Sequence, residues 1–524
     1  MNLAAALELA VHRYPEADAI VTPEGSLSYD QWNCRINSVA WRLYKAGIQP
    51  GDRVAICSAN GEPPATMYFA AQKIGAVAVL LNSRWKEKEL AYALNDSASK
   101  AIFYDQVSEE EVLKALRPNA LNPLQIVSQS RSNNTEKDTT LTYEELTDSP
   151  EKQPPNLGHE ETEIGTILYT SGTTGIPKGV CRTCRSDYYA SLALIIEHRW
   201  SRFERILGVM PLYHTMGLHT LISMVLLNGT VVMLPKANPA ECIKAIEVER
   251  ITALYLVPTI YHDLVEYLNL SAKSPLKVPK LAYAGAPMPV NLINKCRDTF
   301  CPDVFVNQYG STEMLAITIN PRLDINPASA GRPALHSRIR IVAADRNRRV
   351  LPDEMLARGE VGEVIVEATS PQTFSGYLNK PEQTEQVLRN GWYFTGDLGF
   401  IDEKGDLVLS GRIDDMIISG GENIFPYEVE RILLSHPLVK DAAVVGVPDE
   451  RWGEVVTAFI VPDSVELESE MLERFCRESP ELARYKRPRH FIFTREIPKS
   501  VSGKVLYSIL KKEALSLTSK RPLK

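Results

Sequence analysis

Short apolar segments that are typical of buried β-strands alternate with segments of helical periodicity along the first part of the chain. Arg53–Ser58 (RVAICS) and Ala76–Leu81 (AVAVLL) flank a predicted helix over Thr66–Gly75, and strand-like segments return at residues 101–104 and 253–257. Uniformly apolar strands alternating with helices are typical of a largely parallel sheet covered by helices. The pattern therefore predicts an α/β fold.

One helix start is marked clearly in the sequence. Ser28 and Gln31 have the spacing of a capping box, in which each side chain bonds the backbone N–H of the other residue. Apolar side chains then follow at helical spacing until Gly47, namely Trp32, Ile36, Val39 and Leu43. We therefore expect an amphipathic helix that begins after Ser28.

A chain of 524 residues is too long for one ordinary core, and its character changes near Arg412. Beyond that point we expect a glycine-rich turn, a helix, two strands, a second helix and a basic turn, at residues 419–421, 426–435, 441–447, 455–461, 469–476 and 485–488. We predict a large domain over 1–412 and a small, mobile α+β domain over 413–524. The polar segment Ser128–Glu163 is expected to be mostly surface loop.

Composition excludes several classes of protein. An apolar fraction of 44% and a charged fraction of 23% are those of a globular enzyme. A net charge of −7 argues against general affinity for nucleic acid or for an anionic membrane. No basic leader opens the chain, and its most apolar stretch, Leu218–Leu234, is interrupted by Asn228-Gly229, so neither a signal peptide nor a spanning helix is expected.

The eight cysteines do not form an obvious disulfide or zinc pattern. Cys181 and Cys184 alone have metal or redox spacing, and no second ligand pair of that kind follows. We expect reduced structural thiols and a cytoplasmic location.

The strongest local signal is YTSGTTGIPKGV, which spans Tyr169–Val180 directly after a strand-like segment. Glycines and small hydroxylated residues allow backbone N–H and side-chain O–H groups to converge on one polyanion, and Lys178 adds positive charge. Pro177 stands where a Walker A loop has its second glycine, so this is a different phosphate-binding motif. A flexible surface loop is the structural alternative.

Several further motifs occur along the chain: NQYGSTE (307–313), YFTGD (393–397), Gly411-Arg412 and PKSVSGK (498–504). Together with the loop, they resemble those of the adenylate-forming superfamily, which includes acyl-CoA synthetases, luciferases and peptide-synthetase adenylation domains. GRIDDMIISGGENIFPYEVER (411–431) is most similar to the acid–CoA ligases of the 4-chlorobenzoate type. The resemblance runs from near the start of the chain to about Leu506.

The resemblance implies a set of ATP-binding residues. These are Thr170, Ser171, Gly172, Thr173, Thr174, Lys178, Gly285, Ala286, Pro287, Tyr309, Gly310, Thr312, Asp397 and Arg412. Asp397 would bind the ribose hydroxyls, Tyr309 would stack on adenine, and Thr312 would bond the α-phosphate. Glu313 is a hard oxygen ligand suited to Mg²⁺.

The implied catalytic residues are Lys504, His214, Thr312 and Glu313. An ammonium group at Lys504 would relieve repulsion between the attacking carboxylate and the α-phosphate. Its alternative is a solvated lysine near a chain end. His214 is assigned to substrate positioning, without proton transfer, and a buried structural histidine is its alternative.

The implied acyl pocket comprises Met210, His214, Thr215, Met216, Tyr255, Ala284 and Gln308, each of which could singly be an ordinary core residue. None of these side chains is a carboxylate that could pair with an α-ammonium group, which argues against amino-acid activation. Coenzyme A would be bound by Gly420, Gly421, Trp452, Tyr485, Lys486 and Arg487, although YKRP alone is typical of a solvated turn. Asp414 would be the hinge of the small domain.

These observations predict an ATP-dependent acid–CoA ligase that first adenylates a carboxylic acid and then forms a thioester. An aryl or cyclic acid is the first expectation for the substrate, and a medium- or long-chain fatty acid is the second. The alternatives are a stand-alone enzyme that loads a carrier protein, a luciferase-like oxygenase and a non-catalytic ligand-binding relative. The resemblance also leaves a homodimer open.

Overall fold

The computed structural model describes residues 2–117, 123–128, 140–148, 151, 153, 155, 157, 160–170, 176–271, 275–345, 348–499 and 505–518. The chain forms two compact units. The first unit comprises Met1–Arg338 and Glu367–Trp392, and the second comprises Ile339–Val366 and Tyr393–Lys524. The predicted boundary at residue 412 falls inside the second unit and stays a prediction.

An eight-stranded sheet in the first unit has the order β19-β9-β8-β4-β3-β5-β6-β7. Its strands are β3 (Arg53–Cys57), β4 (Val77–Leu80), β5 (Ala101–Tyr104), β6 (Leu124–Val127), β7 (Thr140–Thr142), β8 (Ile164–Thr170), β9 (Lys178–Thr183) and β19 (Gly376–Tyr377). The pairs from β8 to β7 are parallel, whereas β9 is antiparallel to both β8 and β19. Connecting helices are α2 (Tyr29–Lys45), α3 (Glu62–Lys73), α4 (Glu87–Ser97), α5 (Glu109–Leu116) and α6 (Tyr143–Thr147).

A nine-stranded sheet in the same unit has the order β16-β15-β14-β13-β12-β10-β11-β1-β2. The central strands β10 (Arg205–Gly208), β11 (Thr230–Met233), β12 (Ala253–Leu256), β13 (Lys280–Tyr283) and β14 (Val304–Tyr309) are parallel. The outer strands are β1 (Asp18–Thr22), β2 (Gly25–Ser28), β15 (Thr318–Asn320) and β16 (Arg332–Pro333). Both sheets confirm the predicted α/β fold.

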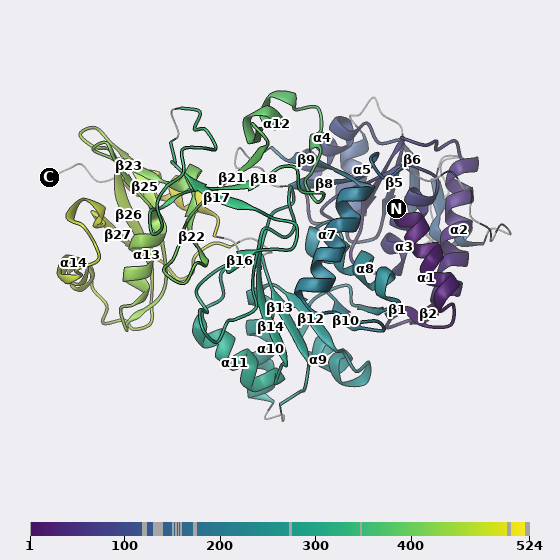
Figure 1. Ribbon diagram of the computed structural model, residues 1–524, viewed down its shortest axis with the longest axis horizontal. Helices are drawn as coiled ribbons and strands as arrows, with labels where there is room; N and C mark the ends of the chain where they lie inside the picture. Colours follow the sequence, from purple (N-terminus) through teal and green to yellow (C-terminus); the bar gives the residue numbers. More distant parts are fainter. Residues whose placement is uncertain are drawn as a thin grey trace. The chain divides into compact units, whose positions relative to one another are not determined.

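Two buried helices lie between these sheets (Figure 1). The helix α7 (Cys184–Glu197) contacts β8 and β9, whereas α8 (Thr215–Leu227) contacts β10, β11 and β12, and the two helices pack on each other. Further helices of this unit are α1 (Leu3–Arg13), α9 (Pro239–Val248), α10 (Pro258–Leu270), α11 (Val290–Phe300) and α12 (Pro381–Val387). Because α7 and α8 contact different sheets, side chains on them can join segments of both.

Several local features predicted from the sequence are present in the structure. The predicted capping box is present: the Ser28 hydroxyl accepts from the Gln31 N–H, and the Gln31 side chain accepts from the Ser28 N–H. The apolar stretch 218–234 forms α8 and β11 around Asn228, whose φ of 49° lies in the left-handed region. All eight cysteines are free thiols, as expected. In the described part of the chain, no helix has the length and apolar character that crossing a membrane requires.

The prediction of a surface loop over 128–163 was wrong in part. Its described residues include β7, which pairs with β6, and α6, whose Thr142 side chain accepts from the Glu145 N–H. Tyr143 and Leu146 of this helix are buried. A five-residue helix with two apolar anchors is too short to give a clear periodic signal in a polar sequence.

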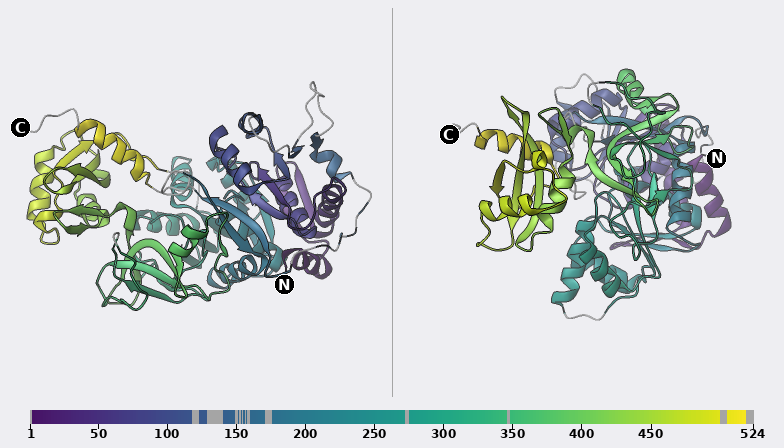
Figure 2. Two further views of the ribbon diagram at one scale, coloured as in Figure 1. Left: turned by 90° about the horizontal axis from the view of Figure 1, so that it is seen from above. Right: turned by 60° about the vertical axis from the view of Figure 1, so that its left-hand side comes forward.

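The described residues of the second unit form two smaller sheets, and three helices lie around the C-terminal sheet (Figure 2). In one sheet, β18 (Gly362–Glu367) pairs with β17 (Ile339–Val342), and β21 (Trp392–Ile401) pairs with β22 (Leu407–Arg412). The other has β23 (Ile417–Ser419), β24 (Glu422–Ile424), β25 (Val439–Asp449), β26 (Gly453–Pro462) and β27 (His490–Phe493). Its helices are α13 (Pro426–Leu434), α14 (Ser469–Glu478) and α15 (Tyr507–Thr518), and the predicted order of elements beyond 412 is confirmed.

A carboxylate joins three elements of the second unit. Glu430 on α13 accepts hydrogen bonds from the Val444 N–H of β25 at 2.8 Å and from the Tyr507 hydroxyl of α15 at 3.0 Å. Burial raises the pKa of Glu430 to about 7, against the two hydrogen bonds that lower it, and the nearby Asp415 and Asp441 raise it further. The folded protein therefore favours the protonated form of this side chain.

We predict that Glu430→Gln makes the second unit less sensitive to pH. A carboxyl group whose pKa is higher in the folded state stabilises the fold at acidic pH and loses that contribution as pH rises toward 7. The free energy of unfolding of the wild type should fall by about 2 kcal/mol relative to the variant between pH 5 and 7. Scanning calorimetry of both whole chains at several pH values measures this difference, and parallel profiles would contradict it.

Candidate active site

The two described ends of the phosphate-loop motif lie on the neighbouring antiparallel strands β8 and β9. Thr170 at the end of β8 pairs with Lys178 at the start of β9. The predicted ligands Ser171, Gly172, Thr173 and Thr174 lie outside the described residues. The Lys178 ammonium group lies 5.1 Å from the centroid of the Tyr377 ring, so β19 helps to orient it. The structure thus brings Thr170 and Lys178 together at one edge of the first sheet.

The predicted metal ligand has an unpredicted partner on the same tyrosine. The Tyr377 hydroxyl donates to Glu313 Oε1 at 2.7 Å, and the Phe374 N–H donates to the Glu313 carbonyl at 2.9 Å. Tyr377 therefore contacts Lys178 with its ring and Glu313 with its hydroxyl. This arrangement places a cation and a carboxylate near one another with a rigid aromatic side chain holding both.

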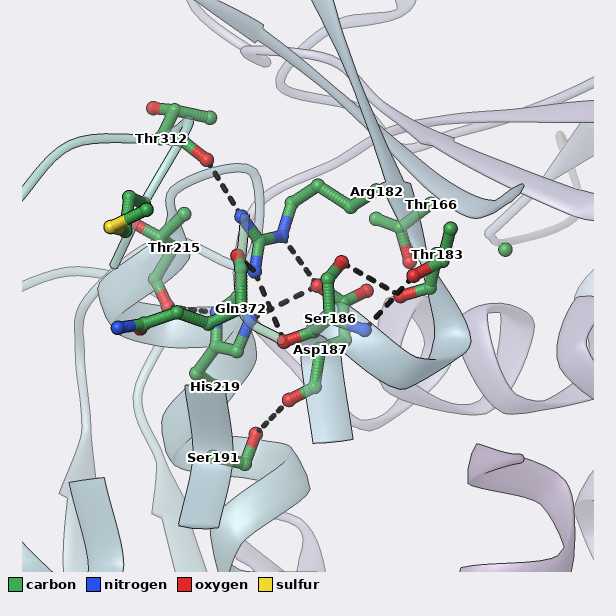
Figure 3. Close-up of polar contacts among 12 residues, drawn as sticks. Thr166, Arg182, Thr183, Ser186, Asp187, Ser191, Thr215, His219, Thr312 and Gln372 are labelled. Carbon is green, nitrogen blue, oxygen red and sulfur yellow. Dashed lines mark hydrogen bonds and ion pairs between the residues drawn. The ribbon is translucent and has the colours of Figure 1, made fainter. Parts of the chain in front are cut away.

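Thr312 is anchored by a buried guanidinium (Figure 3). Arg182 on β9 is fully buried, and its Nη1 donates to the Thr312 carbonyl at 2.9 Å. Its Nε donates to Asp187 Oδ1 of α7 at 2.5 Å, and Nη2 donates to the Ser186 carbonyl at 3.4 Å. An unpaired buried guanidinium would be very costly, so these acceptors fix the Thr312 backbone relative to β9 and α7.

The same carboxylate also holds the start of α8. His219 Nε2 lies 3.1 Å from Asp187 Oδ1, and His219 Nδ1 lies 2.9 Å from the Thr215 carbonyl (Figure 3). Burial acts to raise the pKa of Asp187, but Arg182 and His219 outweigh it and the pKa falls to about 2. Asp187 is therefore an anion at neutral pH. It connects the Thr312 and Thr215 segments through the side chains of Arg182 and His219.

The segment around His214 is held from both sides. The Asn60 side chain donates to the carbonyls of Gly208 and Met210, at 3.3 and 2.7 Å, and accepts from the Leu212 N–H at 3.0 Å. In the next turn, a Cβ at Gly217 would lie 2.3 Å from the Pro211 carbonyl oxygen. Only glycine permits this close approach, which sets His214 at the N-cap of α8.

The predicted adenine segment follows the parallel strands β13 and β14 at their carboxyl ends. Gly285 has a φ of +89°, and Ala286 and Pro287 follow it. At the end of β14, Tyr309 precedes Gly310, where a Cβ would lie 1.8 Å from the Leu315 carbonyl oxygen. Ligands of open α/β sheets bind at the carboxyl ends of such strands, so both segments lie where a nucleotide is expected.

The predicted acyl-pocket residues come from β12, β14, the segment after β13, the segment before α8 and the first turn of α8. Met210, Met216, Tyr255, Ala284 and Gln308 are buried, whereas His214 and Thr215 are half-buried. Gln308 has a buried partner that sequence reasoning did not identify: its Oε1 lies 2.8 Å from His198 Nε2, at the end of α7. The predicted acyl pocket is therefore polar where Gln308 contacts His198.

The predicted ribose pair lies in the second unit. Asp397 on β21 is in register with Arg412 on β22, and Arg412 Nη1 donates to Asp397 Oδ1 at 2.7 Å. The Thr395 hydroxyl accepts from the Asp397 N–H and donates to the Val364 carbonyl, which fixes the turn. One carboxylate oxygen thus faces Arg412 directly.

Among the predicted coenzyme A residues, Gly420 lies against Trp452. The Gly420 N–H donates to the Trp452 carbonyl at 2.7 Å, and a Cβ at Gly420 would lie 2.9 Å from its ring. The guanidinium groups of Arg451 and Arg489 lie 4.9 and 4.8 Å from that ring. Lys486 donates to Glu428 at 2.6 Å, so part of its charge is already balanced. Arg451 and Arg489 were missed because basic residues at chain positions far apart give no local motif.

Of the predicted hinge and the predicted catalytic lysine, only the hinge lies among the described residues. Asp414 lies in the 3₁₀ turn Ile413–Asp415, where its carbonyl accepts from Lys511 Nζ at 3.3 Å. Lys504 lies outside the described residues, although Lys499 and Val505 on either side form an antiparallel bridge. Arg182, Asp187, His219 and Tyr377 were not predicted, because none of them lies within a motif that the sequence shows.

Comparison with known families gives matches to both parts of the chain. A family described as AMP-binding enzyme matches residues 7–378, and the AMP-binding enzyme C-terminal domain matches residues 428–504. A 4-chlorobenzoate–CoA ligase of Arthrobacter sp is 32% identical, over 95% of this chain and 92% of the relative. A 2-succinylbenzoate–CoA ligase of Bacillus mycoides is also 32% identical, over 95% and 96%.

Solved structures show the same similarity. ATP-bound MatB from Rhodopseudomonas palustris has a TM-score of 0.85 and 26% identity, covering 99% of this chain and 100% of that one. The o-succinylbenzoate CoA synthetase of Bacillus subtilis, in complex with its acyl-adenylate intermediate, has a TM-score of 0.80 and 28% identity, covering 97% of each chain.

We predict that Asp187→Asn destabilises the first unit by about 3–5 kcal/mol, because it leaves the Arg182 guanidinium buried without a counter-ion. Replacing both partners by apolar residues, Arg182→Met with Asp187→Leu, should recover most of that loss. The double variant should nevertheless have a turnover number about tenfold to a hundredfold lower, because Thr312 loses its anchor.

Chemical denaturation and steady-state kinetics measure the two effects separately. Glu266→Gln serves as the control, because its pair with Lys295 is exposed, at 42% and 43%, and the loss of such a pair should change stability little. A double variant with wild-type stability and wild-type turnover would contradict the anchoring role.

Proposed function

The chain belongs to the AMP-binding enzyme family and is an AMP-forming acid–CoA ligase, and from this premise we propose the residues that carry its reaction and the class of acid it takes. One observation supports the placement of the first half-reaction more than any other. Lys178, Tyr377 and Glu313 form one chain of contacts beside the hairpin that joins β8 and β9.

The reaction has two balanced halves. A carboxylate oxygen attacks the α-phosphorus of ATP, and pyrophosphate leaves with the electrons of the broken phosphoanhydride bond. The thiol of coenzyme A then attacks the carbonyl carbon of the acyl-adenylate, loses its proton, and AMP leaves. The anhydride supplies the good leaving group that the free carboxylate lacks.

Each proposed residue acts on charge or orientation. Lys178 and the loop before it bind the phosphates, and Thr312, whose carbonyl is held by Arg182, bonds the α-phosphate. Lys504 neutralises charge between the two anionic reactants during adenylation. Tyr309 and Gly285–Pro287 contact the adenine, and Asp397 with Arg412 binds the ribose. His214, set at the N-cap of α8, orients the carboxylate.

The donor set suits a magnesium ion that travels with ATP. Within the described residues, no group of three or more His, Cys, Asp or Glu side chains could hold a metal. Glu313 is a single hard ligand, and Mg²⁺ commonly combines one or two carboxylates with phosphate oxygens and water. Mg²⁺ would neutralise phosphate charge, and Tyr377 would orient the Glu313 carboxylate that holds it.

For the acid, we propose an aryl or cyclic carboxylic acid, with a medium- or long-chain fatty acid as the second choice. Five of the seven proposed pocket residues are buried, His214 and Thr215 are half-buried, and none of the seven carries a carboxylate. Gly420, Gly421 and Trp452, with Tyr485, Lys486 and Arg487, would bind coenzyme A, and Asp414 would be the hinge. A cytoplasmic location and a homodimer stay predictions.

The substrate proposal is tested by coenzyme A-dependent AMP formation with a panel of acids. Benzoates, phenylacetates, cyclohexane carboxylates and straight-chain acids of six to sixteen carbons cover the two proposed classes. We expect at least one cyclic acid to have a higher kcat/KM than every straight-chain acid. A straight-chain acid with the highest kcat/KM would contradict the first choice.

We predict that Lys504→Ala slows acyl-adenylate formation by about a hundredfold or more, while thioester formation from a supplied acyl-adenylate changes little. The ammonium group is needed only where two anions meet, and its loss should cost about 3 kcal/mol or more in that half-reaction. Single-turnover measurement of each half separates them, and equal losses in both halves would refute the assignment.

Asp414→Pro is the matched variant with the opposite expected pattern. Proline fixes φ near about −65° and should restrict motion at a hinge. Adenylation should persist in this variant while thioester formation falls.

We further predict that Tyr377→Phe raises the Mg²⁺ concentration for half-maximal adenylation by about tenfold, because Glu313 loses the hydroxyl that orients it. Tyr143→Phe is the matched control: its hydroxyl also donates to a glutamate, Glu62, at 2.7 Å, in a part of the unit with no proposed ligand role. An equal Mg²⁺ requirement in both variants would exclude a role for Tyr377 in metal binding.

A further inference from the structure

Among the described buried polar atoms of the first unit that have no hydrogen-bond partner, two belong to neighbouring rings. They are His198 Nδ1 and the Tyr255 hydroxyl. Both side chains are about 1% exposed, and their ring centroids lie 4.7 Å apart. A buried polar atom without a partner is uncommon in a folded protein, and two on adjacent rings indicate a shared reason.

Strand register places this pair in the proposed acyl pocket. Tyr255 of β12 pairs with Ala282 of β13, and Ala282 pairs with Val306 of β14. Because side chains alternate along a strand, Ala284 and Gln308 lie two residues further on the same face. Tyr255, Ala284 and Gln308 therefore share one face near the carboxyl ends of three parallel strands.

The hydrogen bonds of Gln308 determine which ring nitrogen of His198 carries the proton and which one can accept a hydrogen bond. Gln308 Nε2 donates to the Leu315 carbonyl at 2.9 Å, so its Oε1 is the atom that faces His198 Nε2. Because an amide oxygen can only accept, His198 Nε2 must carry the proton. Burial lowers the pKa of His198 to about 3, so the ring is neutral near pH 7. Its Nδ1 is then a lone-pair acceptor.

His198 and Tyr255 therefore offer a ligand one acceptor nitrogen and one hydroxyl group, without a formal charge. A ligand hydroxyl is complementary to this pair, because it can donate one hydrogen bond to Nδ1 and accept one from Tyr255. A second carboxylate or an ammonium group would find no counter-ion on His198, Tyr255 or Gln308 and would be costly to bury.

We propose that His198 and Tyr255 bind a hydroxyl group on the acyl portion of the substrate, so that the enzyme prefers hydroxylated acids to their unsubstituted counterparts. This inference rests on the proposed position of the acyl pocket. The proposed hydroxyl-binding pair adds a specificity site to the mostly apolar pocket. It would favour acids that carry a neutral hydroxyl group over dicarboxylic acids and amino acids.

The test measures binding of matched, non-reactive acyl-adenylate analogues to the whole protein. N-acylsulfamoyl adenosines are prepared in three pairs: benzoyl and 4-hydroxybenzoyl, phenylacetyl and 4-hydroxyphenylacetyl, octanoyl and 8-hydroxyoctanoyl. In at least one pair, we expect the hydroxylated analogue to bind about tenfold or more tightly by calorimetry. If no pair shows such a preference, the proposal is wrong.

Two tyrosine variants test the residue assignment. Tyr255→Phe should reduce the preference to about threefold or less, since a merely structural change would weaken both members of a pair alike. Tyr261→Phe is the control, because that buried hydroxyl already donates within the protein, near the carbonyls of Leu254 and Ala282 at 3.2 and 3.0 Å. It should lower the melting temperature and keep the preference. A preference that survives in Tyr255→Phe would contradict the assignment.

The outcome is separable from that of the proposed function. Analogues that bind with a hydroxyl preference, in a protein that forms no acyl-CoA from the corresponding acids, would contradict the proposed substrate class and support the hydroxyl-binding pair. Acyl-CoA formation with no hydroxyl preference in any pair of analogues would contradict only the proposed hydroxyl binding by His198 and Tyr255.

Discussion

The buried ion pair between Arg182 and Asp187 is the interaction on which the proposed site depends most. A guanidinium without access to water must find acceptors for its N–H groups, and here they are Asp187 and the carbonyls of Ser186, Thr312 and Gln372. Asp187 in turn faces His219, which contacts the start of α8. One desolvated pair thereby sets the positions of two loops that carry proposed reactive residues. Such pairs rarely add stability, so positional specificity is the better explanation for this one.

The fold was predictable where its causes are local in sequence. The capping box at Ser28, the apolar strand β5 and the turn at Asn228 each follow from residues within a few positions of one another. The site was predictable only as far as its motifs extend. The Arg182–Thr312 and Glu313–Tyr377 contacts join residues 130 and 64 positions apart, and no periodic pattern reports such pairs. Lys504 and residues 171–174, which carry much of the predicted chemistry, lie outside the described residues.

Charge is distributed in the two parts of the first unit according to the ligand each would bind. The proposed nucleotide side has Lys178 and Glu313, whose charges suit phosphates and a cation. The proposed acyl side has His198, Tyr255 and Gln308, which carry no charge, and the His198 Nδ1 atom and the Tyr255 hydroxyl have no hydrogen-bond partner. A charged acyl tail would pay a desolvation penalty there that a neutral polar tail avoids. The same first unit can therefore hold a polyanion and remain selective for an acid with a single charge.

The central claim is that the carboxylate attacks the α-phosphorus of ATP. It is tested most directly by following oxygen from the carboxylate of the best acid in the panel, labelled with ¹⁸O at both positions. The account predicts AMP that carries one ¹⁸O atom, an acyl-CoA that keeps the other, and pyrophosphate with none. ADP as the nucleotide product, with ¹⁸O in inorganic phosphate, would contradict it.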